Sequence, residues 1–137
     1  MYTGRCLTAG ILLLVMSTAT ANLSPCPSTP NCVSSLALDA DHRVEPISFS
    51  MQPEAALLRI RHLVSVLPRT VIVREEGTYL HAEVRSLVFR FVDDLELIVD
   101  ADNGLIHVRS ASRTGHSDLG VNRRRVERLR REFNKYE

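Results

Sequence analysis

The chain has 137 residues, a formal net charge of +1 at pH 7 and 45% hydrophobic residues. This length suits one globular domain, and the balanced charge argues against a protein that binds nucleic acid through bulk positive charge. No internal repeat or low-complexity tract interrupts the sequence.

Residues 1–21 have the pattern of a secretory signal peptide. Arg5 precedes the apolar run 6–16, which is too short to cross a bilayer as a helix, and Ala19-Thr20-Ala21 fits a signal-peptidase site. We therefore expect an exported protein, periplasmic or secreted, without a transmembrane span after cleavage. Retention of the segment as a membrane anchor is the alternative.

Segment 22–51 is rich in Pro, Ser, Asn and Asp, which predicts an extended N-terminal arm with at most short edge strands. Its two cysteines, Cys26 and Cys32, are expected to form a disulfide because the exported compartment is oxidising. Two metal ligands are the alternative, but no second Cys or His pair has a zinc-type spacing. The domain that follows is expected to span 52–137.

The first helix is predicted from Pro53 to the residue before Pro68, because apolar residues recur there every three or four positions. Its apolar stripe consists of Ala56, Leu57, Ile60, Leu63, Val64 and Leu67.

The apolar period then changes to two. Strands are expected at 70–74, 79–86, 88–92, 95–99 and 105–111, with turns at 75–77 and 101–104 and a bulge or bend at Asp93-Asp94.

A last helix is predicted from about Leu119 to Asn134, with Asn122 on its apolar stripe. Together these elements predict a two-layer α+β domain. An antiparallel sheet of four to five strands would carry the N-terminal and C-terminal helices on one face.

The junction between the last strand and the last helix is the candidate site. Arg123, Arg124 and Arg125 lie in or near the first helical turn, where the helix dipole is already positive, so a negative group should lie nearby. We predict binding of an anionic or polar small ligand, or of an envelope partner, at this junction. The predicted ligand-binding residues are Arg109, Ser110, Ser112, Arg113, Ser117, Asp118, Asn122 and Arg123, supported by Asp93 and Asp94.

Two alternatives remain open at the junction. In a structural role, Asp118 or Ser117 would cap the helix, and Asn122 would be a buried amide bonded within the protein. In a hydrolase, Asp93, Asp94 and the 109–122 cluster would carry the chemistry. However, Ser117 lies beside a histidine and an aspartate only in sequence, and triads are recognised by geometry.

Cofactors and further partners receive weaker support. His81, Glu83 and His107 would share one sheet face, which is a signal of low specificity for a metal, so no metal and no cofactor are expected. The basic helix face around Arg124 and Arg128 could contact an anionic membrane, but a solvated face is the simpler interpretation.

Three blocks of the chain resemble the domain of unknown function 1499 family. They are Cys26-Pro-Ser-Thr-Pro-Asn-Cys32-Val33-Ser34-Ser35, Phe89-Arg90-Phe91-Val92-Asp93-Asp94, and Arg109-Ser110-Ala111-Ser112-Arg113 followed by Gly115 and Ser117-Asp118-Leu119-Gly120-Val121-Asn122-Arg123. The resemblance covers essentially all of the chain after the signal peptide. It implies no activity, substrate or cofactor, but its blocks coincide with the cysteine loop, the Asp pair and the junction.

Overall fold

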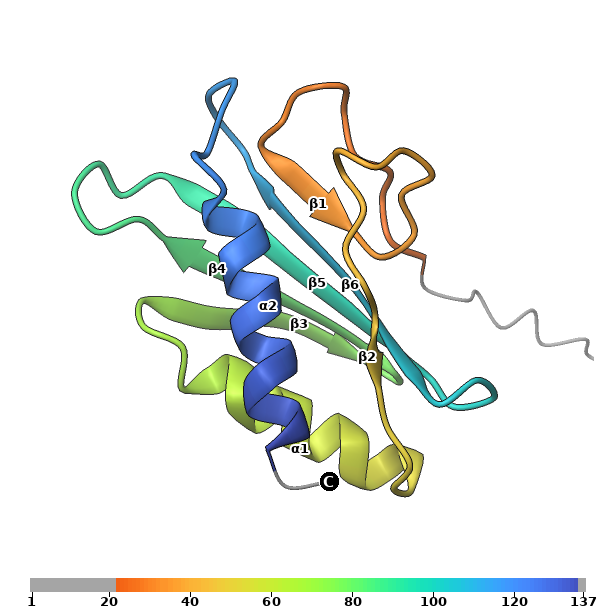
Figure 1. Ribbon diagram of the computed structural model, residues 1–137. Helices are drawn as coiled ribbons and strands as arrows, with labels where there is room; N and C mark the ends of the chain where they lie inside the picture. Colours follow the sequence, from red (N-terminus) through yellow and green to blue (C-terminus); the bar gives the residue numbers. More distant parts are fainter. Residues whose placement is uncertain (1–21, 136–137) are drawn as a thin grey trace, which may run out of the picture.

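The computed structural model describes residues 22–135 and contains two helices and six strands within that range (Figure 1). In chain order they are β1 (Cys32–Ser34), β2 (Ile47–Ser48), α1 (Pro53–Ser65), β3 (Thr70–Glu76), β4 (Tyr79–Arg85), β5 (Val92–Asp100), β6 (Leu105–Ser112) and α2 (Val121–Asn134). The predicted signal peptide lies outside the described residues. No helix within 22–135 is long and apolar enough to cross a membrane.

The strands form one antiparallel sheet in the order β1-β6-β5-β4-β3. Strand β2 also pairs with β6, at residues 105–106, whereas β1 pairs with residues 109–111 of the same strand. The N-terminal arm therefore supplies two short strands to the β6 edge, which raises the strand number from the predicted four or five to six. Both helices lie on the same face of this sheet (Figure 1). The predicted two-layer α+β architecture is confirmed.

The core lies between the helices and this sheet face. The two-residue period of the strands points alternate side chains to the helices, and the helical stripes meet them there. Fully buried side chains include Ile60 and Val64 of α1, Leu95 of β5, and Leu129 and Phe133 of α2. Because the registers of β5 and β6 place Asp93 opposite Ser112 and Leu95 opposite Ser110, polar groups cluster at one end of this face.

The segment 88–92 was predicted as a strand, and this was wrong. Residues 86–91 form the loop between β4 and β5, and Arg90 adopts a φ of 54°, a left-handed conformation that a strand cannot accommodate. Phe89 and Phe91 stack on each other in this loop, with ring centroids 5.5 Å apart. The two phenylalanines alternate with polar residues as they would in a strand, but both rings are exposed and neither lies in the core.

The predicted bulge at Asp93-Asp94 was also wrong, because both residues pair regularly with β4 and β6 inside β5. The irregularity lies instead between Ile72 and Arg74, where β3 pairs with β4. Glu75 and Glu76 belong to β3 rather than to the turn that follows.

The last helix begins at Val121, two residues later than predicted. Leu119 and Gly120 have φ of 53° and 77°, so the chain turns there before the helix starts. Leu119 was expected on the buried stripe, but it is 84% exposed.

Candidate functional site

Asn122 is the centre of a buried polar cluster at the start of α2. Its side chain is fully buried and makes hydrogen bonds in several directions. The Oδ1 atom accepts from the Ser110 hydroxyl at 2.6 Å and from Arg125 Nη1 at 2.6 Å. The amide nitrogen donates to Asp118 Oδ2, Ser112 Oγ and the carbonyl of Asn31, at 2.8, 3.0 and 3.2 Å. This amide therefore joins β6, the loop after it, α2 and the N-terminal arm.

A buried ion pair completes the cluster on the β5 side. Arg125 Nη2 lies 2.6 Å from Asp93 Oδ2, and the two side chains are only 10% and 9% exposed. The Nη1 atom of Arg125 also donates to Ser110 Oγ at 2.9 Å. Because Arg125 is three residues after Asn122, one turn of the helix places both side chains over the same sheet residues.

The start of α2 is capped by the protein itself. Asp118 accepts the backbone N–H groups of Gly120 at 2.9 Å and of Asn122 at 2.8 Å. Burial alone would raise the pKa of Asp118, but these N–H donors outweigh it and hold the pKa below its ordinary value. The carboxylate therefore occupies the position that an anion would take at this helix N-terminus.

Arg109 and Arg113 lie on the opposite sheet face, away from Asn122. Arg109 binds Glu96 at 2.8 Å, and Glu96 also accepts the Tyr79 hydroxyl at 2.8 Å. Burial, followed by the neighbouring Glu96, raises the pKa of Tyr79 well above its ordinary value, so the hydroxyl stays protonated. This part of the predicted site is a cross-strand network on the outer face.

Asp94 holds the second half of that network. Arg113 binds both of its oxygens, at 2.9 and 2.7 Å, and also reaches Glu83 at 2.7 Å, while His81 Nε2 lies 2.7 Å from Asp94. Burial alone would raise the pKa of Asp94, but the bonds from Arg113 and His81 lower it overall. Asp93 points to the helices and Asp94 to the outer face, so the two carboxylates do not converge on one site.

The remaining arginines of the helix start bind backbone carbonyls. Arg123 donates to the carbonyls of Asp41 and Arg43, both at 2.7 Å, and so ties α2 to the N-terminal arm. Arg124 donates to the carbonyl of Leu119 at 2.8 Å. Among the three arginines predicted to need a counter-charge, Arg125 receives a carboxylate, that of Asp93, although it was not among the predicted ligand-binding residues.

A cavity of about 400 Å³ opens beside the buried cluster. Its lining includes apolar side chains of the β4–β5 loop and of Leu119 and Val121, which we call the walls, and polar side chains from β5, β6 and the loop after β6, which we call the floor. The floor residues are Asp93, Ser112, Thr114, Ser117 and Asp118. Among the described residues that line this cavity there is no Lys, Arg or His. The apolar wall was missed because its residues were predicted to be a strand.

The floor retains hydrogen-bonding capacity towards the cavity. Asp93 Oδ1 accepts no bond from any described residue, since only Oδ2 meets Arg125. The Ser117 hydroxyl oxygen accepts a weak bond from the Leu119 N–H at 3.3 Å, and its proton remains available. The hydroxyl of Thr114 makes no hydrogen bond to the described residues. Two hydroxyl groups and one carboxylate oxygen can therefore meet a ligand.

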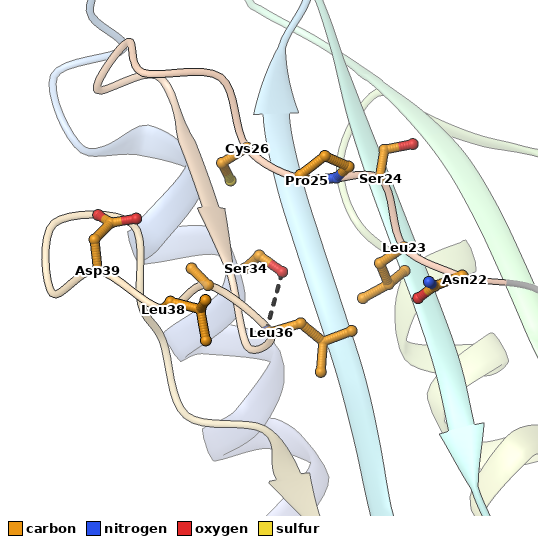
Figure 2. Close-up of a pocket in the computed structure, with 10 residues that line it drawn as sticks. Asn22, Leu23, Ser24, Pro25, Cys26, Ser34, Leu36, Leu38 and Asp39 are labelled. Atoms are coloured by element: carbon orange, nitrogen blue, oxygen red, sulfur yellow. Dashed lines mark hydrogen bonds between the residues drawn. The ribbon is translucent and has the colours of Figure 1, made fainter.

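A second hollow, of about 440 Å³, lies along the N-terminal arm (Figure 2). It is lined by the arm residues 22–26 and by the segment after β1, where the Leu36 N–H donates to Ser34 Oγ at 3.2 Å. Asp39 is the charged side chain at its rim, and it binds His42 at 2.6 Å. The adjacent Cys26–Cys32 disulfide confirms the predicted pairing.

Residues 22–135 contain no group of three His, Cys, Asp or Glu side chains placed to hold a metal ion. His81 lies against Asp94, and His107 lies 3.6 Å from Asp100 on another part of the sheet.

No curated protein and no solved structure is significantly similar to the chain. The sequence model of one family, described as Protein of unknown function (DUF1499), matches residues 22–133 and so includes the arm, the whole sheet and nearly all of α2. The chain therefore belongs to the DUF1499 family.

Proposed function

We propose that this protein is an exported binding domain whose ligand occupies the cavity between the β4–β5 loop and the start of α2. The observation that carries this proposal is the cavity itself, which has apolar walls and a polar floor with free hydrogen-bonding groups. Its volume falls within the ~300–1,000 Å³ typical of small-molecule sites.

The chemistry of the lining favours a neutral amphiphile over an anion. Arg109, Arg113 and Arg125 are engaged by Glu96, Asp94 and Asp93, and Asp118 fills the anion position at the helix start. An anionic group in the cavity would face Asp93 and Asp118, and the cation beside them, Arg125, is already paired with Asp93. A ligand with hydroxyl groups and an apolar tail would meet the floor and the walls respectively.

Among the predicted ligand-binding residues, this proposal assigns ligand contact to Ser117, with Asp93 and Thr114 beside it. Ser112 and Asp118 line the cavity and stay bonded within the protein. Ser110 and Asn122 would hold the floor in place from beneath. Arg109, Arg113 and Arg123 would stabilise the fold around it through the ion pairs and carbonyl bonds described above.

A fluorescence titration tests the proposal, because the chain contains no tryptophan. Phe89→Trp places a single reporter on the cavity wall, and an alkyl maltoside is added below its critical micelle concentration. We expect a saturable blue shift whose affinity rises with chain length. The single substitution Thr114→Trp, which leaves Phe89 in place, puts a bulky side chain on the floor and should prevent binding of a radiolabelled maltoside.

Leu58→Ser is the matched control, because Leu58 is 67% exposed on α1, outside the cavity lining. It should leave binding unchanged. A titration without saturation, or equal binding by the Thr114→Trp variant, would show that the cavity is not the ligand site.

A further inference from the structure

The tip of the β4–β5 loop and the start of α2 form an apolar surface patch. Leu87, Val88 and Phe89 are 73%, 75% and 73% exposed, Phe91 is 52% exposed, and Leu119 across the cavity mouth is 84% exposed. Large apolar side chains grouped in this way on an exposed surface mark an interaction site. We call these five residues the apolar rim.

The loop holds these side chains outward. Its ends are joined because the Ser86 N–H donates to the Phe91 carbonyl at 2.8 Å, and the Phe91 N–H donates to Ser86 Oγ at 2.9 Å. The left-handed φ of Arg90 turns the chain at the tip between the two stacked rings. In Figure 1 this loop projects beyond the sheet at the end where α2 begins.

Arginine side chains surround the rim. Arg90 lies within the loop itself, between Phe89 and Phe91. Arg69, Arg124 and Arg128 line a third hollow, of about 240 Å³, which shares Val121 with the cavity wall. Arg69 is also fixed to the base of the loop, because its Nε donates to the carbonyl of Arg85 at 3.0 Å.

None of these four arginines lies at ion-pair distance from a carboxylate of residues 22–135, although Arg69 and Arg124 each donate to a backbone carbonyl. Lys135 is the main cause of the lowered pKa of Glu132, and the charge of Arg128 contributes to it without forming an ion pair. The acids closest to the rim are occupied, Asp93 by Arg125 and Asp118 by the helix N–H groups. The apolar tip and its positive border therefore match a surface that is apolar below and anionic above.

We propose that this face docks on an anionic lipid bilayer, with the apolar rim entering the interface and the four arginines contacting lipid phosphates. Interfacial binding of this kind combines buried apolar area with attraction to anionic headgroups. A protein partner would need carboxylates placed opposite these particular arginines, whereas an anionic bilayer presents negative charge along its whole surface. This docking does not depend on the cavity holding a ligand.

Vesicle flotation tests the proposal with the chain lacking residues 1–21. The vesicles are phosphatidylcholine alone or a 7:3 mixture of phosphatidylcholine and phosphatidylglycerol. We expect binding to the anionic vesicles at 50 mM NaCl, at least tenfold tighter than to neutral vesicles and much weakened at 500 mM NaCl. In the Phe89→Trp variant, the emission should shift to the blue only with anionic vesicles.

Two pairs of substitutions separate the apolar and the charged contributions. Leu87→Ser with Phe89→Ser, and Arg124→Gln with Arg128→Gln, should each weaken binding at least fivefold. The matched control for the apolar pair is Leu58→Ser. The matched control for the charged pair is Arg61→Gln with Arg74→Gln, because Arg61 and Arg74 are exposed on other surfaces and their substitution removes the same net charge. The Thr114→Trp variant should still bind vesicles, which separates docking from ligand binding in the cavity.

Several results would overturn the proposal. One is a folded chain that does not float with anionic vesicles at low salt. Another is vesicle binding that falls equally with the control pairs. A concentration-dependent dimer in light scattering that Leu87→Ser with Phe89→Ser abolishes, without vesicle binding, would assign the rim to a second copy instead.

Discussion

The buried pair of Asp93 and Arg125 makes the strongest prediction about the fold of the junction. Asp93→Ala would leave the Arg125 guanidinium 90% buried without its carboxylate, while Ser110 and Asn122 still accept two of its bonds. Removal of one partner from a buried pair costs about 3–5 kcal/mol. Because two neutral acceptors remain, we expect the lower end, about 3 kcal/mol.

Arg125→Met removes the charge and retains most of the side-chain volume. In the double variant no uncompensated charge remains, so its destabilisation should be smaller than the sum of the two single variants. We expect a coupling of about 2 kcal/mol, within the range known for contacting residues. Urea unfolding followed by far-ultraviolet circular dichroism gives the four free energies of unfolding. Additive single effects, or a loss below about 1 kcal/mol for Asp93→Ala, would refute the assignment of this pair as a buried structural element.

Three further predictions concern the cap, the arm and the disulfide. Asp118→Ala should lower the free energy of unfolding by about 1 kcal/mol, because the helix loses its cap. The folded pKa of Asp118 is lowered, so its contribution to stability is present above about pH 4 and is lost as the pH falls through the folded pKa. Asp118→Asn should therefore flatten that part of an acid-unfolding curve. The Thr29 carbonyl, followed by Asp39, raises the pKa of His42, so an NMR titration should give a pKa above the ordinary histidine value. The contribution of His42 to stability should be complete below about pH 6 and should be lost as the pH rises through the folded pKa. Replacement of Cys26 and Cys32 by Ser should lower the free energy of unfolding by about 2 kcal/mol, because the cross-link that closes a seven-residue loop is lost. An unchanged melting temperature would contradict this prediction.

The sequence predicted the elements whose side-chain period is set by the core. The stripe of α1 and the alternation of β4 and β6 follow directly from burial on one face, so these elements were found within a few residues. The loop 86–91 was not, because Phe89 and Phe91 alternate without being buried. The two-residue period alone does not distinguish a buried strand from an apolar loop tip that stays exposed.

The polar cluster was found as a group of residues but not as a set of partners. Asn122 on the apolar stripe of α2 indicated a buried amide, and the structure shows it bonded to Ser110 and Ser112. Its partner Asn31 comes from 91 positions earlier in the chain, and no local spacing connects the two. Likewise, the separation of Asp93 from Asp94 follows from their opposite directions in β5, which became apparent only once the strand was known to start at Val92.

The central claim is that the ligand enters the cavity while Arg109, Arg113 and Arg125 stay paired with carboxylates within the protein. The most direct measurement is a ¹H–¹⁵N NMR titration of the chain with decyl maltoside and, separately, with inorganic phosphate. We expect decyl maltoside to shift the amide signals of 86–91 and 112–121, and phosphate to leave the signals of Arg109, Arg113 and Arg125 in place. Shifts of those three arginine signals with phosphate, and none with decyl maltoside, would contradict this claim.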